Sequence, residues 1–143
     1  MKKMMVFSGC IILLLASVVS MIYAEMQKID LSEGNLADLK GKWVGSRSSG
    51  TGATFNTDLE IFNDSVPIQG KFIFYDLITP GSRSTRTQVI DFKRGKINDQ
   101  GNLLIEGYRN KWELSLYKDD GKLKIEGHFF STVGEGAMSF RKK

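Results

Sequence analysis

The sequence predicts an all-β domain, a single antiparallel up-and-down β-barrel of about eight strands. Apolar and polar residues alternate with a period of two from Gly41 onward. Glycine is frequent, with 15 residues, and proline is rare, with 2, as is typical of many short strands joined by tight turns. A Leu-x-Ile-Glu-Gly pattern occurs in residues 101–108 and again 20 positions later in residues 121–128. Such a repeat corresponds to two strands and two turns, which is the pattern of a β-meander.

The expected strands follow one another with short polar connections. A single helical turn, covering residues 36–39, is expected before the first strand, capped by Ser32 or Asn35. Turn residues separate the later segments, for example Asp120-Gly121. The predicted strands cover residues 42–47, 53–62, 68–77, 85–93 with a continuation over 95–98, 101–108, 111–117, 121–128 and 136–141.

Glycines recur in the middle of these strands, at Gly70, Gly107 and Gly127. A glycine inside a strand weakens it and usually marks a bend, a bulge or a closely packed neighbour. Repeated glycines of this kind favour a sheet that curls into a barrel, and closure removes the exposed edges of the sheet.

The N-terminal segment has the features of a secretory signal peptide. Lys2 and Lys3 precede an uncharged run over residues 4–24, and polar sequence begins at Glu25. The run is also about long enough to span a bilayer, so an uncleaved anchor is the alternative. We therefore expect a secreted or periplasmic protein, or one that is anchored in the membrane through residues 4–24.

Three parts are predicted along the chain: the signal peptide or anchor at 1–24, an extended lead-in at 25–34 and the β-barrel domain at 35–143. The formal net charge is +4, and removal of Lys2 and Lys3 would reduce it to about +2. A nearly balanced charge argues against nucleic acid as a partner. The one cysteine, Cys10, lies in the targeting segment, so the domain is expected to have no disulfide and no cysteine ligand for a metal.

A resemblance to a known family rests on Gly41-Lys42-Trp43 near the start of the barrel and Arg141 near its end. This arrangement resembles the calycin group, which includes lipocalins, fatty-acid-binding proteins and avidins. The resemblance implies that Trp43, preceded by Gly41, packs against Arg141 and closes the bottom of the barrel. The domain departs from the group because it has no cysteine, lacks the later loop motifs of lipocalins and is shorter than a typical lipocalin.

Strand alternation places several polar residues on the same face as the aromatic core, toward one rim of the barrel. A mostly apolar cup with a few convergent polar groups is typical of a small-molecule site. The alternative is that these polar side chains lie at strand ends and reach water. The candidate ligand-binding residues are Arg47, Phe55, Phe72, Phe74, Asp76, Arg109 and Trp112.

The sequence does not favour catalysis or a metal or cofactor site. His128 is the one histidine, and no serine and acid are spaced to act with it. Glu106 and Glu126 recur at matched positions, but both alternate with core residues and should point outward. Asp119 and Asp120 indicate a turn rather than a calcium loop.

We therefore expect an exported, non-enzymatic protein that holds a small, partly apolar ligand inside the barrel. Arg47 and Arg109 would orient the polar end of that ligand. The alternative is a filled barrel that acts as an interaction or inhibitor module and binds an envelope protein, with recognition by loops 46–52 and 79–84.

Overall fold

The computed structural model describes residues 26–78, 81 and 84–143, and for Asp76 and Ile78 it describes the backbone alone. The predicted targeting segment 1–24 and part of the predicted loop 79–84 lie outside these residues. Within the described chain, no helix has the length and apolar character needed to cross a membrane.

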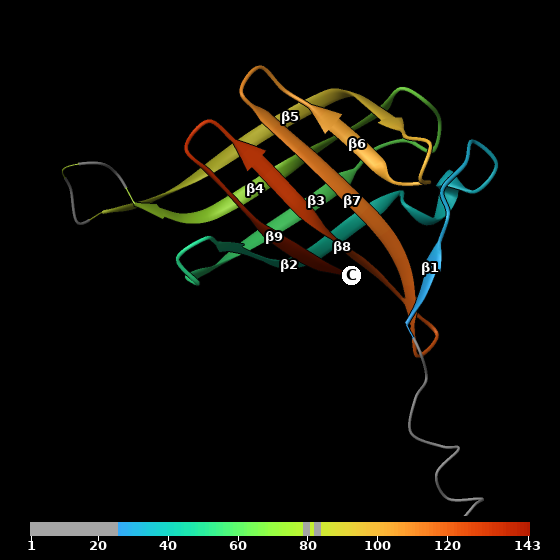
Figure 1. Cartoon of the computed structure of the whole chain (residues 1–143), viewed down its shortest axis with the longest axis horizontal. Helices are drawn as coiled ribbons and strands as arrows, with labels where there is room; N and C mark the ends of the chain where they lie inside the picture. The colour runs from blue at the N-terminus through green and yellow to red at the C-terminus, as the bar shows by residue number, and fades with distance from the viewer. Residues whose placement is uncertain (1–25, 79–80, 82–83) are drawn as a thin grey trace, which may run out of the picture.

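The fold is an antiparallel closed barrel of eight strands with one additional strand and almost no helix (Figure 1). This architecture confirms the predicted fold class. The elements are β1 Gln27–Ile29, the 3-10 turn η2 Leu36–Asp38, β2 Gly41–Ser49, β3 Thr54–Ile61, β4 Ile68–Ile78, β5 Thr85–Ile97, β6 Leu103–Glu106, β7 Asn110–Asp119, β8 Lys122–Ser131 and β9 Gly134–Lys142.

Closure of the barrel depends on the pairing of β2 with β9. Every strand from β2 to β8 pairs with the next strand along the chain, as a meander requires. The register of β2 and β9 then runs from Trp43 opposite Lys142 to Ser49 opposite Gly136. This last pairing satisfies backbone groups that would otherwise form two open edges.

Two glycines in the middle of strands allow the sheet to coil tightly. A Cβ atom at Gly45 would lie 1.9 Å from the carbonyl oxygen of Ser139 on the neighbouring strand. At Gly127 it would lie 2.1 Å from the carbonyl oxygen of Glu113. The neighbouring backbone occupies the space that a side chain would need, so these positions require glycine.

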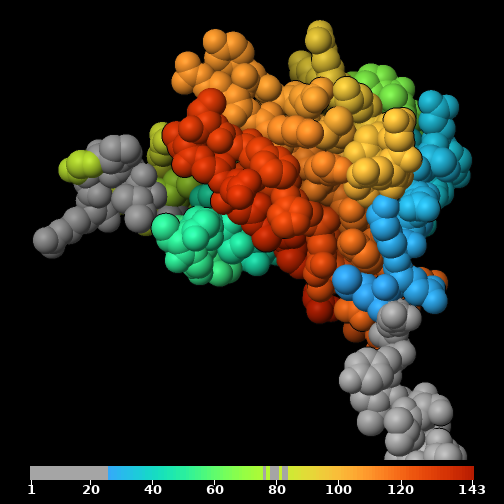
Figure 2. Space-filling view, viewed as in Figure 1, coloured from blue at the N-terminus to red at the C-terminus, as the bar shows by residue number. Residues whose placement is uncertain are grey.

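Strand β1 extends the sheet beside the short strand β6. Because β6 pairs only with the first half of β7, the second half is free on that side, and β1 pairs there, with Ile29 opposite Leu116. The Leu31 amide donates a hydrogen bond of 2.9 Å to the carbonyl oxygen of Gly101 and joins the lead-in to the β5–β6 turn. Figure 2 shows this blue segment lying against the orange and yellow residues of β7 and β6. The sequence predicted an extended lead-in but not its pairing.

Trp43 closes one end of the barrel, which we call the closed end. Its side chain is fully buried, and its indole Nε1 donates a hydrogen bond of 2.8 Å to the carbonyl oxygen of Leu39. Leu36, the first residue of the 3-10 turn, and Leu39, which follows the turn, are buried with it. The turn therefore covers the tryptophan and satisfies its one polar atom. Gly41 connects the turn to β2 with a φ of 126°, a conformation that favours glycine.

The basic residue that contacts Trp43 is Lys142 rather than Arg141. The Nζ atom of Lys142 lies 5.3 Å from the centre of the Trp43 ring and donates a hydrogen bond of 2.6 Å to the carbonyl oxygen of Asp38. Arg141 is exposed and pairs with Val44, which is also exposed, because successive residues of a strand face opposite sides. The predicted contact between Arg141 and Trp43 is therefore not formed, and Lys142 contacts Trp43 instead.

A polar network fixes the β5–β6 turn to the outer face of β7. The carboxylate of Glu113 accepts hydrogen bonds from the amide groups of Asn98 and Asn102, at 2.9 and 3.0 Å. The Asn102 side-chain oxygen in turn accepts a bond of 2.8 Å from the hydroxyl group of Ser115. The bond from Asn102, followed by that from Asn98, holds the pKa of Glu113 below its usual value, against the opposing effect of burial.

Replacement of Trp43 by alanine should destabilise the whole domain. The change removes a fully buried indole and its hydrogen bond, and large aromatic deletions of this kind cost about 3–5 kcal/mol. Urea denaturation should detect the loss as a lower midpoint. Val44→Ala, which changes an exposed neighbour, should leave the midpoint nearly unchanged. Equal midpoints for both variants would show that Trp43 does not stabilise the closed end.

Acid should weaken the Glu113 network. A carboxyl group whose folded pKa is depressed stabilises the fold fully above its ordinary pKa of about 4.5, and this contribution is lost as the pH falls through the folded pKa. The variant Glu113→Gln does not titrate, so its free energy of unfolding should fall less than that of the wild type between about pH 6 and about pH 3. Glu33→Gln, in an exposed loop, is the matched control, and its free energy of unfolding should fall by as much as that of the wild type. An equal fall in the free energy of unfolding for the wild type and Glu113→Gln would contradict a stabilising role of the Glu113 carboxylate.

Candidate functional site

A hollow of about 240 Å³ lies inside the barrel at the end opposite Trp43, which we call the open end. Its wall comes from the inner faces of β2, of the paired strands β4 and β5, and of the paired strands β7 and β8. The lining residues are Arg47, Phe74, Leu77, Gln88, Ile90, Asn110, Trp112, Phe129, Ser131 and Val133.

Aromatic rings form the boundary between this hollow and the packed half of the barrel. Phe72 is fully buried, and its ring centre lies 5.0 Å from that of Trp112, 5.8 Å from that of Phe74 and 5.5 Å from that of Phe92. Phe74 and Trp112 line the hollow, whereas Phe72 lies beneath them in the core. The barrel is therefore solid at the closed end and hollow at the open end.

Arg47 is the charged side chain among the described residues that line the hollow. Its guanidinium carbon lies 4.9 Å from the centre of the Phe55 ring and 5.1 Å from that of the Phe74 ring, so the group is held between two aromatic faces. Burial lowers the pKa of the guanidinium, which nevertheless remains charged at neutral pH. Its Nε atom is buried and has no hydrogen-bond partner among the described residues.

A second buried polar atom without a partner lies close to Arg47. The hydroxyl group of Thr57 is fully buried and, within the part of the chain that the structure describes, makes no hydrogen bond. Thr57 pairs with Gly45 on β2, two residues before Arg47, and with Phe74 on β4. Buried polar atoms are almost always satisfied, so two such exceptions on neighbouring strands mark this wall of the barrel as unusual.

The structure brings together some of the predicted site residues. Arg47, Phe74 and Trp112 line the hollow, and Phe55 lies against the guanidinium from outside the lining. Arg109 does not join them, because its guanidinium carbon lies 5.4 Å from the Tyr108 ring on the surface, in a separate depression.

A register shift changes which residue of β4 faces the hollow. Strict alternation from Phe74 predicts Asp76 on the inner face, but the pairing of β4 with β5 is irregular between Phe74 and Leu77. After this irregularity Leu77 lines the hollow, and the side chain of Asp76 lies outside the described part of the structure. A β-bulge adds one residue and inverts the alternation, which a period-two pattern does not reveal.

Sequence reasoning also missed Gln88, Ile90 and Phe129 as lining residues. Gln88 pairs with Phe74, and Ile90 pairs with Phe72, so both follow from the register of β4 and β5. The alternation of β5 contains this signal, but the register is needed to align it with the aromatic residues of β4.

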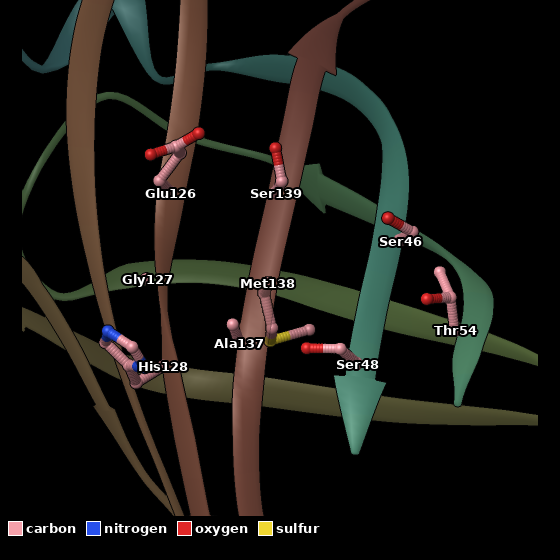
Figure 3. Close-up of a pocket in the computed structure, with 9 residues that line it drawn as sticks. All are labelled: Ser46, Ser48, Thr54, Glu126, Gly127, His128, Ala137, Met138 and Ser139. Atoms are coloured by element: carbon pink, nitrogen blue, oxygen red, sulfur yellow. The ribbon is translucent and has the colours of Figure 1, made fainter. Parts of the chain in front are cut away.

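A further depression, of about 290 Å³, lies on the outer face of β2, β8 and β9. Figure 3 shows Glu126 and His128 at different levels of β8, beside Ser139 on β9 and Ser46 on β2. Glu126 forms an ion pair with Lys124, and the matched Glu106 forms one with Lys96 at 3.2 Å. The two glutamates thus lie in separate ion pairs rather than facing each other across a common site. Among the described residues, no group of three or more acidic, histidine or cysteine side chains is arranged to hold a metal ion.

Comparison of the chain with family models, with curated proteins and with solved structures finds no match. The eight-stranded closed barrel is consistent with a calycin-like architecture, and the comparisons name no member of that group.

Replacement of Thr57 by valine should stabilise the protein in the absence of a ligand. Valine has nearly the same shape and removes a buried hydroxyl group without a partner, which should raise the free energy of unfolding by about 1 kcal/mol. Urea denaturation measures the change, and Thr54→Val, at an exposed position of the same strand, is the control. A loss of about 1 kcal/mol would instead show that the hydroxyl group has a partner in solution.

Proposed function

We propose that the protein is an exported, non-enzymatic binding protein of calycin-like type. It holds a small, partly apolar molecule with an acidic group in the hollow at the open end of the barrel. The observation that carries this proposal is the buried Nε atom of Arg47, which has no partner among the described residues and lies at the wall of an otherwise largely apolar hollow. Leaving a buried charged donor unpaired is unfavourable, and an anionic ligand would satisfy it.

The size of the hollow limits the ligand. Its volume of about 240 Å³ is below the range of about 300–1,000 Å³ that is typical of sites for drug-sized molecules. Phe74, Trp112 and Phe129 present ring surfaces that suit a flat or short apolar body. A single-ring aromatic acid or a short aliphatic acid has the size and chemistry that these walls favour.

Other polar groups of the hollow suit the same ligand class. Gln88, Asn110 and Ser131 line it without introducing another charge. They can donate or accept hydrogen bonds, so they would fix the orientation of a ligand whose carboxylate is bound at Arg47. The alternative of a barrel filled throughout is less well supported, because the packed core ends at the aromatic layer around Phe72.

Binding of benzoate and hexanoate, compared with benzyl alcohol and hexanol, tests the proposal. A hydrogen bond to a charged group contributes about 1.5–3 kcal/mol, so each acid should bind at least about tenfold more tightly than the matching alcohol. Arg47→Met should reduce the affinity for the acid to that for the alcohol. Titration followed by NMR chemical shifts measures both affinities and locates the ligand.

Arg109→Met is the matched control for this experiment, because it removes an arginine that lies outside the hollow. It should leave the affinities of both acids unchanged. Equal binding of acids and alcohols by the wild type, or equal losses in the two arginine variants, would overturn the assignment of Arg47 as the anion-binding group.

A further inference from the structure

The most exposed large apolar side chains of the described chain lie at the open end. Tyr108 and Val133 are each 94% exposed. Tyr108 belongs to the connection between β6 and β7, and Val133 belongs to the turn between β8 and β9. Full exposure of one such side chain is common on a protein surface, but two of them at the tips of neighbouring connections form a distinct feature.

The two connections lie side by side. Asn110 at the start of β7 pairs with Ser131 at the end of β8, so the segments that follow and precede these residues leave the sheet together. Figure 2 shows the orange segment near residue 108 and the red segment near residue 133 projecting next to each other. A depression of about 510 Å³ between them is lined by Tyr108, Arg109, Lys111 and the 41% exposed Phe130, among others. We call Tyr108, Arg109, Lys111, Phe130 and Val133 the open-end rim.

The open-end rim combines apolar tips with positive charge. Arg109 lies over the ring of Tyr108, and Lys111 follows two residues later. The nearby acids are Glu106, which is paired with Lys96, and Glu135, which lies opposite Phe130. The depression between the two connections is thus lined by Arg109, Lys111 and the ion-paired Glu106.

Acidic residues gather in the connections at the opposite end. The three open-end connections that the structure describes in full, residues 50–53, 107–109 and 132–133, contain no aspartate or glutamate. The segments at the closed end contain several of them. These are Asp30, Glu33, Asp38, Asp64, Asp99 and Asp120. The connections at the two ends thus differ in their acidic residues, although the basic residues Lys40, Lys142 and Lys143 also lie at the closed end.

We propose that the open-end rim is a docking surface for an anionic lipid bilayer. Aromatic and aliphatic side chains at loop tips enter the headgroup region of a bilayer, and neighbouring basic residues are attracted by anionic headgroups. The tips are separate projections on two turns, which suits a deformable lipid surface better than a shaped protein partner. This inference does not depend on which ligand occupies the hollow.

Docking in this orientation would bring the mouth of the hollow to the bilayer. Val133 belongs to both the rim and the lining, and Asn110 and Ser131 connect the two. A partly apolar ligand could then pass between the membrane and the hollow without crossing water.

A fluorescent label at the rim tests this proposal. We suggest Val133→Cys in the Cys10→Ser background, labelled with the environment-sensitive dye NBD and mixed with vesicles of about 70% phosphatidylcholine and about 30% phosphatidylglycerol. NBD emission should rise about threefold and move to shorter wavelength as the tip enters the bilayer. The readout is local, so it applies whether or not residues 1–24 are retained. A label at Tyr108→Cys should respond in the same way and provides a second position if Val133→Cys folds poorly.

Controls separate the rim from the rest of the surface. A label at Val66→Cys, in the β3–β4 connection of the closed end, should not respond. The double variant Arg109→Gln and Lys111→Gln should weaken docking by about tenfold or more, since each basic residue near an anionic surface contributes about a factor of five. The double variant Lys118→Gln and Lys122→Gln, which removes two lysines near the closed end, should bind as tightly as the parent protein.

The outcomes are distinct. A response to the mixed vesicles that is lost at about 0.5 M salt and absent with phosphatidylcholine alone supports the proposal. No response at either rim position overturns it, as does an equal response to neutral vesicles. A response that requires a soluble envelope protein instead of lipid also overturns it and would identify the rim as a protein interface.

Discussion

The structure depends on the backbone pairing between its first and last barrel strands. Hydrogen bonds between β2 and β9 convert a meander, which alone would have two open edges, into a closed sheet. This pairing requires close approach of the two backbones, and Gly45 provides the space because Ser139 occupies the position of a Cβ atom. Closure also places Trp43 beside Lys142, so the closed end forms as a direct result of the same register.

The two ends of the barrel differ in how their interior side chains are packed and hydrogen-bonded. At the closed end, Trp43 has its polar atom satisfied by Leu39 and is covered by the 3-10 turn. At the open end, the interior contains the hollow and Arg47, whose buried Nε atom has no partner in the described part of the chain. Among the described residues, the buried side-chain nitrogen and oxygen atoms without a partner are those of Arg47 and Thr57. Both residues lie on neighbouring strands of the barrel, where a ligand could offset the cost of an unpaired polar atom.

Much of the fold could be predicted from the sequence because strand alternation and turn residues are local signals. The repeated Leu-x-Ile-Glu-Gly segments, for example, became β6 and β8 with β7 between them. What the sequence did not reveal depends on contacts between distant segments. The pairing of β1 follows from the shortness of β6, and the exchange of Arg141 for Lys142 follows from a register fixed across the whole barrel. In the site, Arg47, Phe74 and Trp112 line the hollow together, as strand alternation predicted. The irregular pairing before Leu77 could not be predicted, because alternation assumes a regular strand.

The position of the hollow follows from this division of the barrel. A side chain that closes the bottom must be large, buried and satisfied, as Trp43 is, and a ligand there would have to displace core packing. The open end has the opposite properties, because its connections bring exposed apolar tips, basic residues and the mouth of the hollow to one place. Val133 belongs to two of these features at once, as part of the lining and as the tip of a turn. Entry to the hollow and attachment to a surface would therefore affect each other, since whatever covers the rim also covers the mouth.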